Sequence, residues 1–82
     1  MNKPLGYLQE ILTSYGEDRE IANSIILKMH EKRYENTVSF INELNDEQIQ
    51  FLNHSLPDEM KHALESEDFP RLQNLNEVYE LL

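Results

Sequence analysis

Three histidines are the side chains of this 82-residue sequence most suited to metal or acid–base chemistry. Glu59 and His62 stand three residues apart, which places both on one helix face at the Glu-x-x-His spacing of di-iron bundles. Such a centre requires a second copy of the motif and two further carboxylates. The residues three positions before the other two histidines are Leu27 and Phe51, so the motif occurs once. We therefore expect no metal and no cofactor.

Other catalytic arrangements also lack their essential residues. The chain has no cysteine, and its two glycines, Gly6 and Gly16, do not form a phosphate-binding loop. Carboxylates occur as sequence neighbours, such as Asp58 and Glu59, which point about 100° apart on a helix and so do not converge on a substrate. The sequence therefore predicts a protein that is not an enzyme.

The charge of the chain is negative and unevenly distributed. Sixteen Asp and Glu residues face seven Lys and Arg residues, giving a net charge of −9. Residues 43–82 carry ten acidic and two basic side chains, whereas residues 1–42 carry six and five. A field of one sign disfavours nucleic acid and anionic membranes as direct partners and favours a basic protein surface.

Helical signals extend along the whole sequence, and no segment shows the apolar–polar alternation of a strand. The length is that of one domain, so we expect residues 1–82 to form a single all-α domain. Its architecture is predicted to be a small compact bundle of five to six short helices. In chain order, the expected helices run from Asn2 to Gly16, from about Glu17 to Arg33, from Asn36 or Thr37 to Leu44, from Asn45 to Leu56, from Pro57 to Glu65, and from Asp68 to Leu82.

Capping residues set most of these boundaries. Asn45 followed three residues later by Gln48 is typical of a capping box at a helix start. Pro57 disfavours helical geometry at Leu56 and therefore predicts a helix end there. Asp68 is expected to cap the last helix.

Apolar side chains at helical spacing predict the faces that form the core. The strongest stripe comprises Ile21, Ala22, Ile25, Ile26 and Met29. In the helix predicted over Pro57–Glu65, Met60, Ala63 and Leu64 are expected to point inward.

Some apolar and aromatic side chains lie outside these inner faces. Leu27, His30 and Tyr34 form a second strip on the helix predicted to end near Arg33, on the side away from the main stripe. Phe51 falls about 200° from the inner face of its helix, and Phe40 is expected near it. Apolar strips that the core does not use indicate protein contacts when they are contiguous. We therefore predict partner binding by Leu27, His30, Tyr34, Phe40 and Phe51, with core packing as the alternative role.

These features predict a non-enzymatic protein-binding regulatory module, an adaptor, inhibitor or small subunit acting on another bacterial or phage protein. The expected partner is a protein with a basic or apolar patch, and a homodimer is a second arrangement. The alternative function is an acidic DNA mimic that occupies a DNA-binding protein. A third hypothesis is a metal-dependent or phosphotransfer role of His30, His54 or His62. Absent cysteines and the lack of a long apolar segment favour a cytoplasmic location.

Overall fold

The computed structural model describes residues 3–15 and 19–82, and this part of the chain folds into five helices without strands. The helices are α1 (Lys3–Ser14), α2 (Glu20–Glu31), α3 (Thr37–Ile41), α4 (Asp46–Glu65) and α5 (Phe69–Glu80). The all-α prediction is confirmed. The predicted roles of Asn2, Gly16, Glu17 and Asp18 at helix ends lie outside the described residues.

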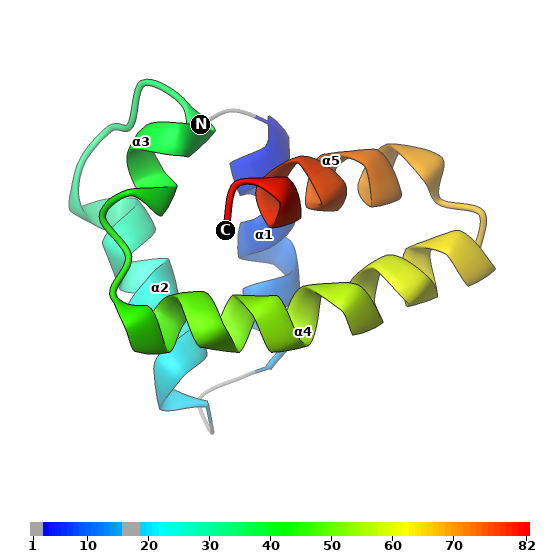
Figure 1. Cartoon of the computed structure of the whole chain (residues 1–82), viewed down its shortest axis with the longest axis horizontal. Coiled ribbons are helices and arrows are strands. Elements are labelled where there is room, and N and C mark those ends of the chain that lie inside the picture. Colours follow the sequence, from blue (N-terminus) through cyan, green and yellow to red (C-terminus); the bar gives the residue numbers. More distant parts are fainter. Residues whose placement is uncertain (1–2, 16–18) are drawn as a thin grey trace.

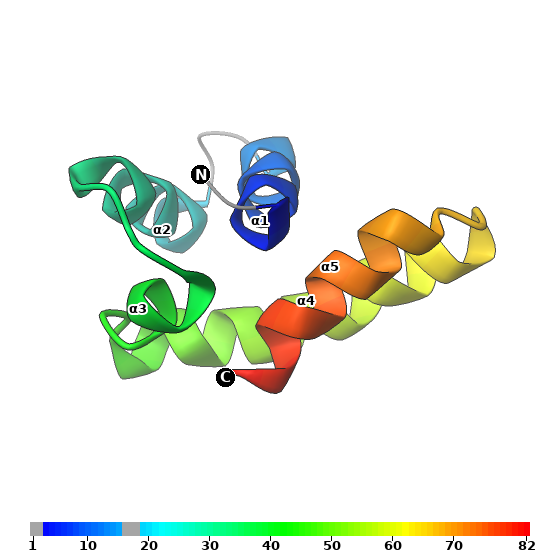
Figure 2. The ribbon, with the colours of Figure 1, turned by 90° about the horizontal axis from the view of Figure 1, so that it is seen from above.

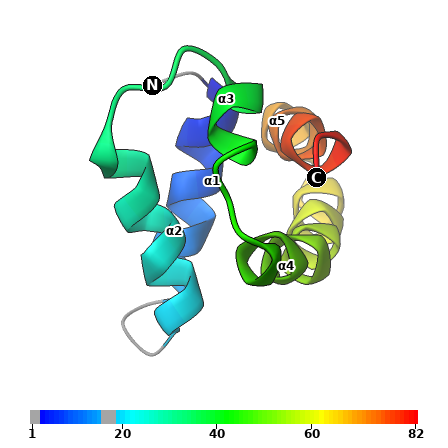
Figure 3. The same ribbon diagram turned by 60° about the vertical axis from the view of Figure 1, so that its left-hand side comes forward.

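Two pairs of helices cross each other around a shared core (Figure 1). Helices α1 and α2 lie side by side, and α4 and α5 form a second, antiparallel pair laid across them, as Figures 1 and 3 both show. The short helix α3 closes one end of the molecule. Figure 2 shows that the turn between α4 and α5 projects beyond α1 and α2.

The core receives apolar side chains from every helix. Helix α1 contributes four of them because Leu5, Leu8, Ile11 and Leu12 share one face. The predicted stripe of α2 also faces inward, with Ala22, Ile25 and Met29 buried. The remaining core positions are Phe40, Ile41, Leu44, Leu52, Leu56, Leu75 and Val78.

The predicted caps of α4 and α5 are confirmed, and α3 is capped by Asn36, one of its two predicted starts. The Asn36 side chain accepts a hydrogen bond from the Ser39 N–H, and Asp68 accepts one from the Arg71 N–H. Asn45 and Gln48 form the complete capping box, with bonds of 2.8 and 2.9 Å between each side chain and the other residue's backbone N–H. These caps satisfy backbone donors that the first turn of a helix leaves without partners.

The predicted helix boundary at Leu56 is wrong, because α4 continues through Pro57 to Glu65. Proline removes one intrahelical hydrogen bond, at a cost of about 3 kcal/mol. Burial on both sides of Pro57 offsets that cost, since Leu56 before it and Ala63 after it are enclosed, and α5 packs along the same helix. Tertiary packing therefore joins two predicted helices into one.

Candidate protein-docking surfaces

The outer face of α2 presents the predicted strip to the surface. Leu27 is 70% exposed and lies about 200° around the helix from the fully buried Ile25. His30 is exposed one turn further on. The Gln9 amide lies 3.3 Å from the His30 Nε2 and donates to it in the tautomer that leaves this nitrogen unprotonated. Leu27 and His30 therefore remain candidates for partner binding.

Tyr34 is half-buried, and its contacts fix it to the fold. Its ring packs edge-to-face on Phe40 at a centroid distance of 5.1 Å, and its hydroxyl donates to the Lys28 carbonyl at 3.1 Å. Burial raises the pKa of Tyr34 above 10.0, and the nearby Glu43 carboxylate adds to this rise. The tyrosine thus supports the end of α2 and exposes only part of its ring.

The two phenylalanines of the predicted surface lie elsewhere. Phe40 is fully buried at the centre of the core, so the expectation that it lies on an accessible surface is corrected. Phe51 is half-buried and packs against the core, with its ring 5.6 Å from that of Tyr15. The helical periodicity of α4 predicts a single buried face. In the structure both α2 and α5 pack against α4, so Phe51 is partly covered as well.

A second exposed apolar region lies at the turn between α4 and α5, and the sequence reasoning missed it. Leu64, predicted to point inward, is 54% exposed, and Phe69 is 55% exposed. Along α5, Phe69, Leu72, Gln73 and Asn76 line a shallow groove of about 440 Å³. Their spacing of i, i+3, i+4 and i+7 is the sequence signal that could have revealed this strip.

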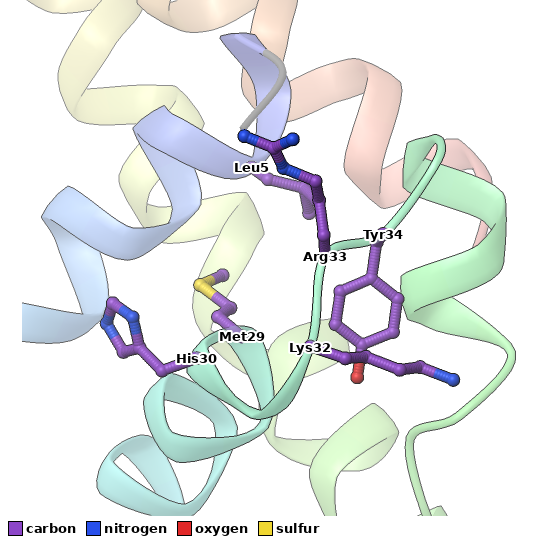
Figure 4. A pocket seen from close by; sticks show the side chains of 6 residues that line it. All are labelled: Leu5, Met29, His30, Lys32, Arg33 and Tyr34. Carbon is purple, nitrogen blue, oxygen red and sulfur yellow. The ribbon is translucent and has the colours of Figure 1, made fainter.

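A pocket of about 260 Å³ lies at the C-terminal end of α2 (Figure 4). Leu5, Met29 and Tyr34 line it together with three basic side chains, but these side chains diverge. His30 points towards α1, the Arg33 guanidinium extends over Leu5, and Lys32 points away on the other side (Figure 4). The Lys32 ammonium bonds the Glu43 carboxylate at 2.6 Å, which raises the pKa of Lys32 above 10.5. This geometry does not converge on an anion.

Metal binding receives no support from side-chain positions either. Across residues 3–15 and 19–82, no three His, Asp or Glu side chains lie close enough together to hold a metal ion. Glu59 and His62 belong to α4, and no further His, Asp or Glu of the described residues joins them as a third ligand.

The acidic side chains within α4 and α5 form no ion pair in the described part of the chain. The guanidinium of Arg71 on α5 instead bonds Asp68, the N-cap of that helix, at 3.1 Å and Glu10 of α1 at 2.6 Å, and it lies over the Tyr7 ring. Both carboxylates raise the pKa of Arg71, with Glu10 the larger cause.

Comparison with known proteins shows the family. The family model of CsgA, described as minor curli fiber component A, matches residues 1–82. The chain belongs to the CsgA family. A Bacillus subtilis (strain 168) protein described as a sigma-G-dependent sporulation-specific SASP protein is 45% identical over 82 residues, covering 100% of this chain and 99% of that protein. No solved structure matches the chain.

In this CsgA-family chain the two exposed apolar regions lie on different helix pairs. Leu27 belongs to α2, whereas Leu64 and Phe69 flank the turn that projects beyond α1 (Figure 2). No helix in the described ranges is long and apolar enough to cross a membrane.

Proposed function

We propose that this chain is a non-enzymatic protein-binding module that acts during bacterial spore formation, as an adaptor, inhibitor or small subunit. The sporulation-specific description of the relative supports the time of action. The observation that carries the binding role is the 70% exposure of Leu27 on the outer face of α2.

A single exposed leucine is common, so its neighbours decide whether it belongs to a surface. Asn23 and His30 precede and follow Leu27 at the spacing of one helix turn, and Asn23 is half-buried whereas His30 is exposed. Lys28 and Glu31, the nearest charged pair, lie 3.9 Å from each other. Burying Leu27 in a partner would contribute about 1.5–3 kcal/mol.

The partner that this chain fits is a protein with an apolar pocket for Leu27 and a basic patch on its surface, since the surplus of carboxylates lies in residues 43–82. The net charge of −9 attracts a cationic surface over a distance of about 8–10 Å at physiological salt. The same charge repels nucleic acid and anionic lipid. Together, the charge favours the encounter and Leu27 stabilises the complex.

Photo-crosslinking in sporulating cells tests this proposal. A photoreactive amino acid replaces Leu27 in one strain and the exposed Gln50 of α4 in a second, and the chain is followed from growth into sporulation. We expect accumulation during sporulation and one defined protein adduct from position 27. Leu27→Asp, which leaves the core intact, should weaken capture of that protein at least about tenfold. Absence of any protein adduct at position 27 contradicts the proposal.

The unpaired carboxylates of α4 and α5 favour one alternative, occupation of a DNA-binding protein as an acidic DNA mimic. This function predicts that the captured partner itself binds DNA and that DNA competes with the chain. It also predicts that affinity falls steeply with salt, since ion pairing would dominate. Binding that persists at high salt argues for the apolar contact of Leu27 instead.

A second copy of the chain is the remaining occupant that the Leu27 face would fit. A two-fold dimer would place one copy of this face against the other. Light scattering decides the point, because a dimer has twice the mass of the 9.8 kDa monomer. A dimer that Leu27→Asp converts to monomer would assign the face to self-association.

A further inference from the structure

The outer face of α5 carries a strip of four side chains, of which Phe69, Gln73 and Asn76 are exposed and Leu72 is half-buried. Phe69, Leu72, Gln73 and Asn76 line one groove of about 440 Å³, and none of them carries a charge. We propose that this groove is a second docking surface and that it binds a basic amphipathic helix of a partner protein. This inference goes beyond the proposed function, because it concerns a different helix and does not depend on Leu27.

The residues of the strip do not belong to the hydrophobic core. The helix packs into the core through Leu75 and Val78, which are both fully buried. Phe69 lies about 180° around the helix from Val78 and is 55% exposed. A large aromatic side chain on the outer face therefore contributes little to the core and remains available for a partner.

Carboxylates surround the strip, and the cation of α5 points away from it. Glu77 and Glu80 lie about 80° and 20° from Phe69 around the helix, and both are exposed. Glu65 and Glu67 are exposed in the preceding turn. Arg71 cannot neutralise them, because it lies about 200° from Phe69 and pairs with Asp68 and Glu10 on the side of α1. The groove is therefore apolar in its lining and negative at its edges.

Charge selects the occupant among the surfaces that could fill such a groove. A second copy would bring the same carboxylates together, since a two-fold contact pairs identical faces. Nucleic acid and anionic membrane carry the same sign as the groove edges. A partner helix with apolar residues at i, i+3, i+4 and i+7 and with Lys or Arg beside them matches both properties.

The expected complex is a helix laid along α5. Apolar side chains of the partner would pack on Phe69 and Leu72, and its cations would pair with Glu77 and Glu80. The amides of Gln73 and Asn76 would bond polar groups at the edge, although Asn76 already donates to Glu80 at 2.9 Å. Because the charges lie at the exposed rim, they mainly speed association, and the apolar contact determines dissociation.

The test uses the full chain and two synthetic helical peptides of equal charge. In the first, leucine occupies one face and lysine the rest, and in the second, serine replaces every leucine. Titration of the isotope-labelled protein is followed by NMR and calorimetry. We expect the leucine peptide to bind at least about tenfold more tightly than the serine peptide. Its chemical-shift changes should centre on residues 69–76.

Matched variants locate the contact. Phe69→Ser should weaken binding of the leucine peptide about tenfold or more, whereas Leu27→Ser, which removes an exposed leucine from α2 at unchanged charge, should leave it unaltered. Circular dichroism checks the fold of each variant. If Phe69→Ser fails to fold, Gln73→Lys at an exposed position takes its place, since its cation would repel the peptide.

Three results would overturn the inference: equal binding of both peptides, parent-like affinity after Phe69→Ser or its replacement, or shift changes centred on α2. These outcomes leave the proposed function standing, because the crosslinks from position 27 test it separately. Conversely, the absence of every crosslink at position 27 would not contradict peptide binding by the groove on α5.

Discussion

Substitution of Glu67 by glycine is expected to stabilise the chain, because of the backbone conformation at this position. Of the described residues, Glu67 is the non-glycine residue with a positive φ, at 60°. It stands just after the end of α4, where the Asp68 N–H bonds the Ala63 carbonyl at 2.8 Å and the Glu67 N–H bonds the Leu64 carbonyl at 3.1 Å. This pair of bonds is the Schellman motif, in which glycine usually holds the left-handed position.

The size of the effect follows from two opposing contributions. A left-handed conformation costs an L-residue about 1–2 kcal/mol, which Glu67→Gly removes. Glycine also gains about 0.5–1 kcal/mol of conformational freedom in the unfolded chain. The charge of Glu67 contributes little to the difference, because it lies between the negative end of α4 and the positive start of α5. We therefore expect a net stabilisation of about 0.5–1 kcal/mol.

Urea and thermal unfolding measure this difference. For a domain of this size the expected rise in melting temperature is about 2–8 °C. Glu67→Ala removes the carboxylate and keeps the Cβ, so it should be less stable than Glu67→Gly by about 1 kcal/mol. Glu65→Gly, the same substitution in the last turn of α4, should instead destabilise the chain by about 0.5–1 kcal/mol.

The relative stability of the glycine and alanine variants at position 67 tests whether the left-handed backbone is strained. An alanine variant as stable as the glycine variant would show that the left-handed backbone is not strained, and the argument would fail. The same motif sets the direction of the chain between Leu64 and Phe69. Glu67→Gly preserves this geometry but removes one carboxylate from the edge of the α5 groove. It should therefore slow association of the leucine peptide slightly and leave the chemical-shift changes centred on residues 69–76.

Three further predictions test the fold and its electrostatics. Pro57→Ala should stabilise the chain by about 1–3 kcal/mol in urea unfolding, because it supplies the N–H that the middle of α4 lacks, and a loss of stability would mean that the ring itself is needed. Phe40→Ala should cost about 3–5 kcal/mol, since the side chain is fully buried, and a near-neutral effect would contradict its place in the core. Burial raises the pKa of Tyr34 above 10.0, so the folded state holds the phenolic proton more tightly than the unfolded state. That contribution to stability is complete below about pH 10 and is lost as the pH rises through the folded-state pKa. Tyr34→Phe should therefore reduce the loss of stability that unfolding measurements detect above pH 10, and an unchanged slope would refute the assignment.

Local chemistry made the caps and the helical class predictable. Asn45 and Gln48 satisfy each other's backbone N–H groups within three residues, so their pairing depends on no distant part of the chain. The stripe on α2 was equally readable, because its period is a property of the helix itself. The same helical period predicts that Leu27 lies opposite this stripe, and the side chain is indeed exposed.

Phe40, Phe51 and Leu64 depended on neighbours from other parts of the chain. Burial of a side chain requires a second surface, and periodicity does not say how many helices supply one. Phe51 meets Tyr15 at the end of α1, whereas Leu64 lies where α4 projects beyond α1. The exposed groove of α5 arises for the same reason, since only the placement of α1 and α4 determines which face of α5 is left uncovered.

The helical class, most helix starts and the acidic second half can be predicted from the amino-acid sequence, because they arise from backbone bonds within a few residues and from composition. The continuation of α4 through Pro57 and the apolar side chains that remain at the surface depend on contacts between segments far apart in the chain. Packing energy between distant segments exceeds the local preference of one proline, and it alone divides apolar residues between the core and the surfaces that can bind a partner.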